Sequence, residues 1–125
     1  MDIAIEQGSP ATVVRISGKV DSLTSDALLQ ALSGEIGACR TRLVADFSEV
    51  EYMSSAGLRA LLITLRETRG QGGDLRLAAV QPPVQRVLDL SGFNTILKVF
   101  GDVPAAVASY VAVGGGSGVG TGAAP

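Results

Sequence analysis

The chain has 125 residues, with ten Lys and Arg against twelve Asp and Glu and a formal charge of -2. This length fits one domain and excludes a large substrate-binding lobe. The charge balance does not favour a nucleic-acid binder, which usually concentrates basic residues on one face. The sequence has no His, the commonest general base near neutral pH and the commonest zinc ligand. Its single cysteine, Cys39, excludes an internal disulfide and a multi-cysteine metal site. We therefore expect no enzyme activity, no metal and no cofactor.

The amino-terminal stretch MDIAIEQGSP lacks the basic start and the apolar run of a secretory signal. No uninterrupted apolar segment approaches the roughly 18 residues that a membrane span needs. We therefore expect a cytoplasmic protein that does not insert directly into a membrane.

The first part of the chain predicts two strands and a helix. Residues Ile3 to Glu6 and Thr12 to Ser17 are rich in β-branched residues and flank a turn of Gly, Ser and Pro, which indicates a hairpin. Thr24 or Ser25 can cap the following helix, and Gly37 can end it. The apolar residues that share one face of this helix are Leu28, Leu29, Leu32 and Ile36.

A nearly continuous apolar run from Leu43 to Phe47, broken only by Asp46, is typical of a central strand. The next segment predicts a helix that ends in a glycine-rich turn at residues 70–73. Its inward positions are Leu58, Leu61, Leu62 and Leu65, and its outward positions are Arg59, Arg66, Glu67 and Arg69.

The last part predicts a strand at Leu75 to Val80, a helix that starts at the proline pair 82–83 and stops near Ser91 and Gly92, and a strand at Leu97 to Phe100. A fourth helical pattern carries Val103, Val107, Tyr110 and Val111. Strands that alternate with helices imply parallel crossovers. The fold class is therefore α/β, with a mixed central sheet of about four to five strands and about four helices. We assign residues 1–112 to the domain and residues 113–125 to a flexible glycine-rich tail.

Two adjacent serines, Ser54 and Ser55, stand where the central strand passes into the second predicted helix. A serine at such a position most often caps the helix. No Glu or Gln follows three residues after either serine to complete a capping box, since Gly57 and Leu58 occupy those places. The turn also follows a parallel strand, where reactive groups of open α/β sheets usually lie, and a helix amino terminus stabilises phosphate. An exposed hydroxyl here suits a phosphoryl acceptor.

The stretch VADFSEVEYMSSAGLRALL, with GKVDSLTSDAL upstream and VQRVLDLSGF downstream, resembles the STAS domain of bacterial anti-sigma factor antagonists. The resemblance covers approximately residues 1 to 112. In that family the helix begins with an aromatic or aliphatic residue followed by Met, Asp, Ser, Ser or Thr, Gly and Leu, and a partner kinase phosphorylates the first hydroxyl residue after the Asp. Alignment on Met53 and Gly57 puts Ser55 at the acceptor, Ser54 at the Asp and Ala56 at the second Ser or Thr. The resemblance thus implies phosphorylation of Ser55, with Ser54 as a competing hydroxyl.

The resemblance also implies a partner-binding surface around the serines. Asp21 matches an acidic position near the acceptor, although a turn residue is an equal explanation. Asp46 lies on the matching strand and is expected near the site, although it can simply accept from local backbone N–H groups. Arg59 lies one turn after Ser55. The predicted partner-binding residues are Asp21, Ser22, Met53, Ser54, Ala56, Gly57 and Arg59.

The function implied is partner switching. The unphosphorylated chain would bind an anti-sigma factor serine kinase, phosphorylation of Ser55 would release it, and a serine/threonine phosphatase would restore the free form. ATP would be used by the kinase, whereas direct nucleotide binding by this chain stays open. The alternative is a constitutive STAS scaffold or adaptor in a stressosome-like or membrane-transport complex, which an exposed apolar surface including Tyr110 would favour.

Two further classes fit poorly. A response-regulator receiver needs an acidic pair after the first strand, which residues Ile3 to Glu6 do not supply. A serine hydrolase needs a base and a G-x-S-x-G turn, and the sequence has neither a His nor that turn around Ser54 and Ser55.

Overall fold

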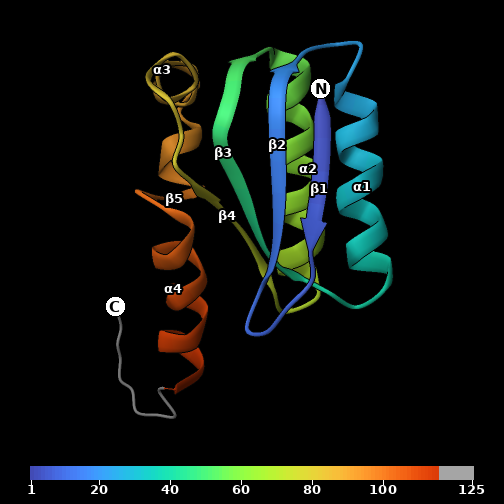
Figure 1. Ribbon diagram of the computed structural model, residues 1–125, viewed down its shortest axis with the longest axis vertical. Helices are drawn as coiled ribbons and strands as arrows, with labels where there is room; N and C mark the ends of the chain where they lie inside the picture. The colour runs from blue at the N-terminus through green and yellow to red at the C-terminus, as the bar shows by residue number, and fades with distance from the viewer. Residues whose placement is uncertain (116–125) are drawn as a thin grey trace.

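Five strands and four α-helices follow one another along the part of the chain that the computed structural model describes, which is the backbone of residues 1–115 and the side chains of residues 1–110 (Figure 1). The strands are β1 (Asp2–Glu6), β2 (Thr12–Val20), β3 (Arg42–Met53), β4 (Asp74–Ala78) and β5 (Lys98–Phe100). The helices are α1 (Ser25–Gly37), α2 (Ser55–Gly70), α3 (Pro82–Ser91) and α4 (Val103–Gly115), with a 3-10 turn η1 (Phe93–Thr95) before β5.

The strands form one mixed sheet in the order β1-β2-β3-β4-β5. β1 is antiparallel to β2, as the predicted hairpin requires, and each following pair is parallel. The α/β class and the mixed sheet are therefore confirmed. β3 is longer than predicted because it runs to Met53, whereas β4 pairs only with its first part, Arg42 to Asp46. The exposed residues Ser48 and Glu49 interrupt the apolar run, so the second part of β3 does not stand out in the sequence.

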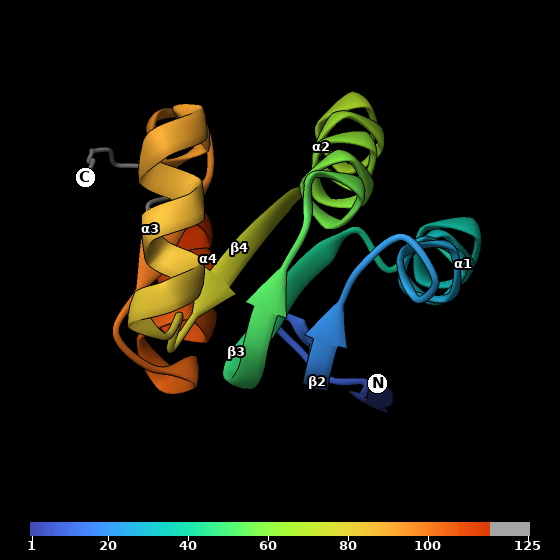
Figure 2. The ribbon, with the colours of Figure 1, turned by 90° about the horizontal axis from the view of Figure 1, so that it is seen from above.

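Alternate side chains of the central strands enter two separate apolar clusters, as the two-residue period of a strand requires. On one face, the sheet packs with α1, α2 and α3, and Figure 2 shows α1 and α2 beside each other on that face. On the other face, the sheet packs with α4. The first cluster includes Val14, Ile16, Ala45, Phe47, Leu61, Leu75 and Leu88, and the second consists of Ala11, Val13, Val44, Ala78, Ala106 and Tyr110.

The predicted helix ends agree with the structure in part. Pro82 and Pro83 open α3, and Gly92 ends it in the left-handed region at φ 81°, where glycine carries no Cβ penalty. Gly37 is the last residue of α1, but the left-handed residue of the following turn is Cys39, at φ 68°. α4 extends to Gly115, three residues into the range assigned to the tail, and residues 116–125 lie outside the described residues.

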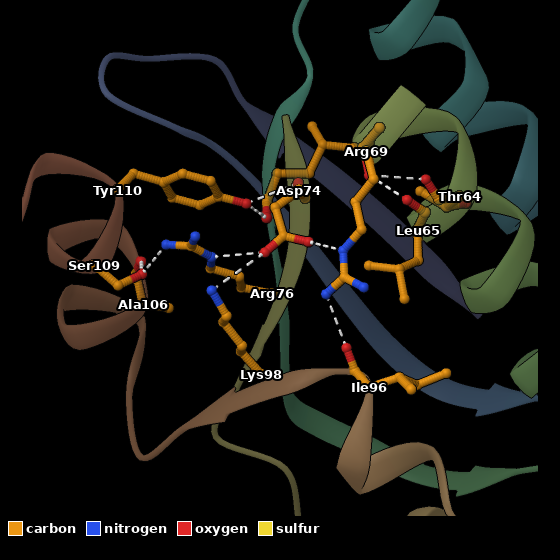
Figure 3. Close-up of polar contacts among 12 residues, drawn as sticks. Thr64, Leu65, Arg69, Asp74, Arg76, Ile96, Lys98, Ala106, Ser109 and Tyr110 are labelled. Carbon is orange, nitrogen blue, oxygen red and sulfur yellow. Dashed lines mark hydrogen bonds and ion pairs between the residues drawn. The ribbon is translucent and has the colours of Figure 1, made fainter. Parts of the chain in front are cut away.

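A polar cluster joins α4 to the sheet (Figure 3). The hydroxyl of Tyr110 lies 2.8 Å from the carbonyl of Leu43 and 2.7 Å from that of Asp74. The Arg76 guanidinium lies 3.9 Å from the centroid of the Tyr110 ring, donates to Ser109 Oγ at 2.6 Å and pairs with Asp74 at 3.1 Å. Tyr110 is only 5% exposed, so it is not part of an exposed apolar surface on the last helix. Tyr110 therefore does not support the alternative of a constitutive scaffold.

No helix within residues 1–115 is both long enough and apolar enough to span a membrane.

Candidate functional site

The two serines lie where β3 ends and α2 begins. The N–H of Ser54 donates to the carbonyl of Val20 at 2.8 Å, which ties this joint to the end of β2. Ser54 itself has extended backbone, with φ -92° and ψ 175°, and the helix starts at Ser55. The joint therefore lies at the carboxyl end of two neighbouring parallel strands, as predicted from the order of the elements.

Ser54 is the cap of α2. Its Oγ accepts a hydrogen bond from the N–H of Gly57 at 3.4 Å, and the residue is half-buried. A serine cap stabilises a helix because it satisfies one of the N–H groups that the first turn leaves unpaired. The prediction that a serine at this joint caps the helix is thus confirmed for Ser54.

Ser55 is the first residue inside α2 and is exposed. Within the described residues its hydroxyl makes no hydrogen bond, so this oxygen is accessible from solvent. It also lies at the positive end of α2, where added negative charge is favourable. The two neighbouring hydroxyls thus differ in environment, one as a cap and the other as an accessible group.

Met53 and Gly57 lie beneath the joint rather than on its surface. Met53 is only 2% exposed, and Gly57 is buried. A Cβ at position 57 would approach Val20 Cγ1 to 2.8 Å and Met53 Cγ to 2.9 Å. The sequence predicted that both residues touch a partner, but the structure places them in the packing between β2, β3 and α2. The close approach that Gly57 permits is to its own chain.

The loop after β2 lies beside the joint, because Val20 pairs with Met53 in the sheet. Asp21 organises this loop: its Oδ1 accepts from the N–H of Leu23 at 2.9 Å and from the N–H of Thr24 at 3.2 Å. The bond from Leu23, helped by those from Thr24, holds the pKa of the Asp21 carboxyl below its usual value despite some desolvation. Asp21 therefore acts as a turn residue, the alternative considered for it, and its carboxylate is hydrogen-bonded within its own loop.

Thr24 is at the cap position of α1, but its hydroxyl does not cap the helix. It accepts from the N–H of Asp21 at 2.9 Å and donates to the carbonyl of Lys19 at 3.0 Å. Its bonds hold the loop closed and leave Ser22 and Leu23 at the surface.

Two exposed apolar residues near the serines were not among the predicted site residues. Leu23 is 88% exposed and Tyr52 is 49% exposed. Arg59, predicted as a contact, is exposed one turn after Ser55, and Ala56 is half-buried. A leucine within the polar loop sequence DSLTS was the available signal for Leu23, since a lone apolar side chain has no packing role in a short turn. Because Met53 is buried in the cluster beneath α2, its neighbour Tyr52 points to the opposite face of the sheet. We define the joint surface as Ser22, Leu23, Ser55 and Arg59.

Asp46 lies elsewhere on β3. It is 7% exposed, accepts from the N–H of Ser48 at 3.0 Å and lies 3.4 Å from Arg15 Nε. It precedes Met53 by seven positions, about 23 Å at the usual rise of a strand. The expectation that Asp46 lies near the serines is therefore not met, and its bonds match the alternative of a local backbone acceptor.

A joint of this kind can present a hydroxyl for modification and bind another protein. Among residues 1–110 no hydrogen bond links the Ser55 hydroxyl to a carboxylate, and the Asp21 carboxylate is engaged with Leu23 and Thr24. Among residues 1–110, no three His, Cys, Asp or Glu side chains group together as metal ligands would.

A family model for the STAS domain matches residues 2–106. The anti-sigma F factor antagonist of Paenibacillus polymyxa is 29% identical over 101 residues, which are 80% of this chain and 86% of the relative. The structure is similar to that of an anti-sigma factor antagonist from Mycobacterium paratuberculosis, with a TM-score of 0.80, 26% identity and coverage of 88% and 93% of the two chains.

It is also similar to SpoIIAA in the unphosphorylated form, with a TM-score of 0.76, 21% identity and coverage of 86% and 95%. For SpoIIAA of Bacillus in the phosphorylated form, the TM-score is 0.69 at 20% identity, with coverage of 86% and 98%. At these identities the two SpoIIAA structures establish a likeness of fold.

Proposed function

Because the chain belongs to the STAS domain family, we propose that it is an anti-sigma factor antagonist that exchanges partners according to the phosphorylation of Ser55. Relatives named as antagonists of anti-sigma factors support this role, and SpoIIAA has been solved in a phosphorylated form. The chain would serve as substrate and ligand in the cytoplasm and would catalyse nothing itself.

The observation that carries the proposal is the division of roles between the two serines. Ser54 caps α2 through the N–H of Gly57, whereas Ser55 is exposed with an unbonded hydroxyl among the described residues. A kinase that reaches the joint therefore meets the Oγ of Ser55 first. Phosphorylation of Ser54 would remove the cap and require the half-buried side chain to leave the helix end.

The partner is an anti-sigma factor serine kinase. It would hold ATP, take the proton from Ser55 and transfer the γ-phosphoryl group to Oγ, with ADP as the leaving group. Before transfer, it would bind the joint surface, in which Leu23 supplies the apolar contact. Removal of this exposed leucine side chain from water would stabilise the complex.

Phosphorylation would weaken this complex because phosphoserine carries a charge of about -1.5 to -2 at neutral pH. That charge would have to lose water in an interface that includes Leu23, at a cost that a neutral hydroxyl does not incur. A serine/threonine phosphatase would remove the phosphate and restore binding. A change of about 3 kcal/mol in binding free energy corresponds to about a hundredfold in affinity.

The test is to incubate the protein with ATP and an anti-sigma serine kinase encoded in the same genome, and to locate phosphate by mass spectrometry in the wild type, Ser54→Ala and Ser55→Ala. We expect phosphate on Ser55 in the first two proteins and none in the third. Kinase binding, measured by calorimetry, should be about a hundredfold weaker for the phosphorylated form. Phosphate on Ser54 would contradict the division of roles. Stable binding with no phosphate on any form would indicate the constitutive scaffold instead.

A matched pair of leucine variants tests the docking surface. Leu23 and Leu90 are both strongly exposed, at 88% and 83%, and Leu90 belongs to α3, which contributes no residue to the joint surface. We expect Leu23→Ala to weaken kinase binding about tenfold, as for a central interface residue, and Leu90→Ala to leave it unchanged. An equal effect of both variants would exclude the joint surface as the docking site.

A further inference from the structure

Arg59 follows Ser55 by four residues within α2, and both residues are exposed. Residues four apart in a helix lie one above the other on the same face, with their Cβ atoms about 5–6 Å apart. The bond from Cα to Cβ tilts toward the amino end of a helix, so a side chain at position 59 leans toward the turn that contains Ser55. A group attached to the Ser55 hydroxyl would therefore lie within reach of the Arg59 guanidinium.

The guanidinium of Arg59 has no acidic partner among residues 1–110. The arginines that pair with carboxylates in this part of the chain are Arg15, Arg40, Arg69 and Arg76. Apart from Ser55, the residues three or four positions from Arg59 are Ala56, Leu62 and Ile63. Since none of these is acidic, α2 itself supplies no carboxylate to Arg59. Its N–H groups are therefore available to an anion.

The first turn of α2 also contains no acidic residue. Acidic groups are favourable at this place in a helix, because the unpaired N–H groups of the first turn give it a partial positive charge. Ser54 satisfies the N–H of Gly57 through its Oγ, but this cap is neutral. A phosphate on Ser55 would bring the negative charge that the first turn lacks.

The chemistry of arginine suits a phosphate. The planar guanidinium can donate two parallel N–H bonds to two oxygens of one phosphate group. Phosphoserine offers three acceptor oxygens and a charge of about -1.5 to -2 at neutral pH. The unmodified hydroxyl of Ser55 is neutral and forms no ion pair. The pairing is therefore possible in only one of the two states of Ser55.

From this arrangement we propose that Arg59 holds the phosphate of phosphorylated Ser55 within the same molecule, an inference that rests on the proposed phosphorylation of Ser55. Before modification, Arg59 gives the joint surface one free positive charge. After modification, the phosphate and Arg59 together carry about -0.5 to -1, and the guanidinium is no longer available to a partner. The charge of the joint surface thus changes sign without a rearrangement of the fold.

The experiment places phosphoserine at position 55 of the full chain during translation, so that it does not depend on a kinase. A ³¹P nuclear magnetic resonance titration then measures the second pKa of the phosphate, which is ordinarily about 6. We expect Arg59→Gln to raise this pKa by about 0.3 pH unit, the size of an exposed helical ion pair, because the dianion loses a nearby cation. Arg59→Lys should keep part of the difference, since it retains the charge without the planar fork.

Arg66→Gln is the matched control. Arg66 is also exposed on α2, but it lies 11 residues after Ser55, about 17 Å along the helix axis, so its loss should leave the phosphate pKa unchanged. The Nε–H signal of Arg59 should shift with the same midpoint as the phosphorus signal. Equal pKa values in the wild type and Arg59→Gln, or an equal effect of both glutamine variants, would overturn the pairing.

The two proposals can fail separately. Because the phosphate is installed without a kinase, an unchanged pKa in Arg59→Gln would reject the role of Arg59 and leave the kinase experiment unaffected. Absence of phosphate on Ser55 in the kinase experiment would instead reject the proposed function.

Discussion

The backbone of Gly57 lies directly against Val20, so that a Cβ on residue 57 would come within 2.8 Å of Val20 Cγ1 and 3.3 Å of the Val20 carbonyl. This contact brings the first turn of α2 down onto the end of β2. The contact between Gly57 and Val20 therefore sets the distance between Ser55 and the end of the sheet.

Gly57→Ala should destabilise the protein despite the better helix propensity of alanine. Relief of the overlap with Val20 and Met53 is expected to cost about 1–3 kcal/mol, against a propensity gain of about 1 kcal/mol. Gly34→Ala is the control, because Gly34 is also helical and a Cβ there meets nothing within 4 Å. Urea unfolding should show a lower midpoint for Gly57→Ala and a higher one for Gly34→Ala. A gain in both variants would show that the contact with Val20 relaxes freely.

The cap of α2 predicts different effects for the two serines. Ser54→Ala removes the acceptor of the Gly57 N–H and should cost about 0.5–1 kcal/mol, whereas Ser54→Asp should retain the cap. Ser55→Ala should change stability by less than about 0.5 kcal/mol, as for an exposed residue without partners. Chemical denaturation of the three variants measures these differences. If Ser55→Ala destabilised the protein more than Ser54→Ala, Ser55 would be the cap of α2 and the assignment of Ser54 would be wrong.

Tyr110→Phe should lower the stability of the protein at neutral pH. The carbonyls of Leu43 and Asp74 would lose the phenolic O–H that lies at 2.8 and 2.7 Å from them, at a cost of about 1–2 kcal/mol. Tyr110→Leu, which also removes the ring beneath Arg76, should cost more. Urea unfolding at pH 7 measures both. Equal stability of Tyr110→Phe and the wild type would mean that these carbonyls find other partners.

The same residue predicts a loss of stability in alkali. Burial raises the pKa of the Tyr110 phenol above its ordinary value, although the positive charge of Arg76 acts to lower it. In the unfolded chain, a tyrosine phenol ionises near pH 10. The contribution is complete below pH 10 and declines as pH rises from there towards the folded pKa, because only the unfolded state releases the proton. The stability difference between wild type and Tyr110→Phe should therefore narrow above pH 10. A constant difference up to pH 11 would contradict the raised pKa.

Asp21 predicts the opposite behaviour at low pH. Because the Leu23 N–H lowers the pKa of its carboxyl, the contribution of Asp21 is present above the unfolded pKa of about 3.9 and is lost as pH falls through the lower folded value. A ¹³C titration should place the midpoint of Asp21 below that of Asp in an unfolded peptide. In Thr24→Val the midpoint should rise but stay low, since the bond from Leu23 remains. A midpoint at or above the peptide value would show that the loop is open in solution.

The sequence predicted the order and type of the elements well because each carries its own local signal. The hairpin, the apolar centre of β3 and the proline and glycine at the two ends of α3 are all legible in short windows. The length of β3 could not be predicted in this way. Its second part carries exposed residues such as Ser48 and Glu51 and pairs with β2 but not with β4.

The site was less predictable, because its arrangement depends on one-residue boundaries and on distant contacts. A shift of one residue in the start of α2 would exchange the roles of Ser54 and Ser55, and sequence patterns do not resolve helix ends that finely. The burial of Gly57 depends on Val20, which is 37 positions away. Leu23 lies at the surface because the hydrogen bonds of Asp21 and Thr24 fix the conformation of the loop.

The two outer strands also affect whether copies of this chain can pair along their sheet edges. β1 begins with Asp2 and ends with Glu6, and β5 has only three residues. If two copies of β1 paired antiparallel about Ala4, Asp2 of each would face Glu6 of the other, and like charges placed opposite one another are destabilising. Short or charged edges oppose the growth of a sheet from one molecule into the next. The sheet is thereby protected against self-association along its margins, and the strand ends rather than the strand edges are left for recognition.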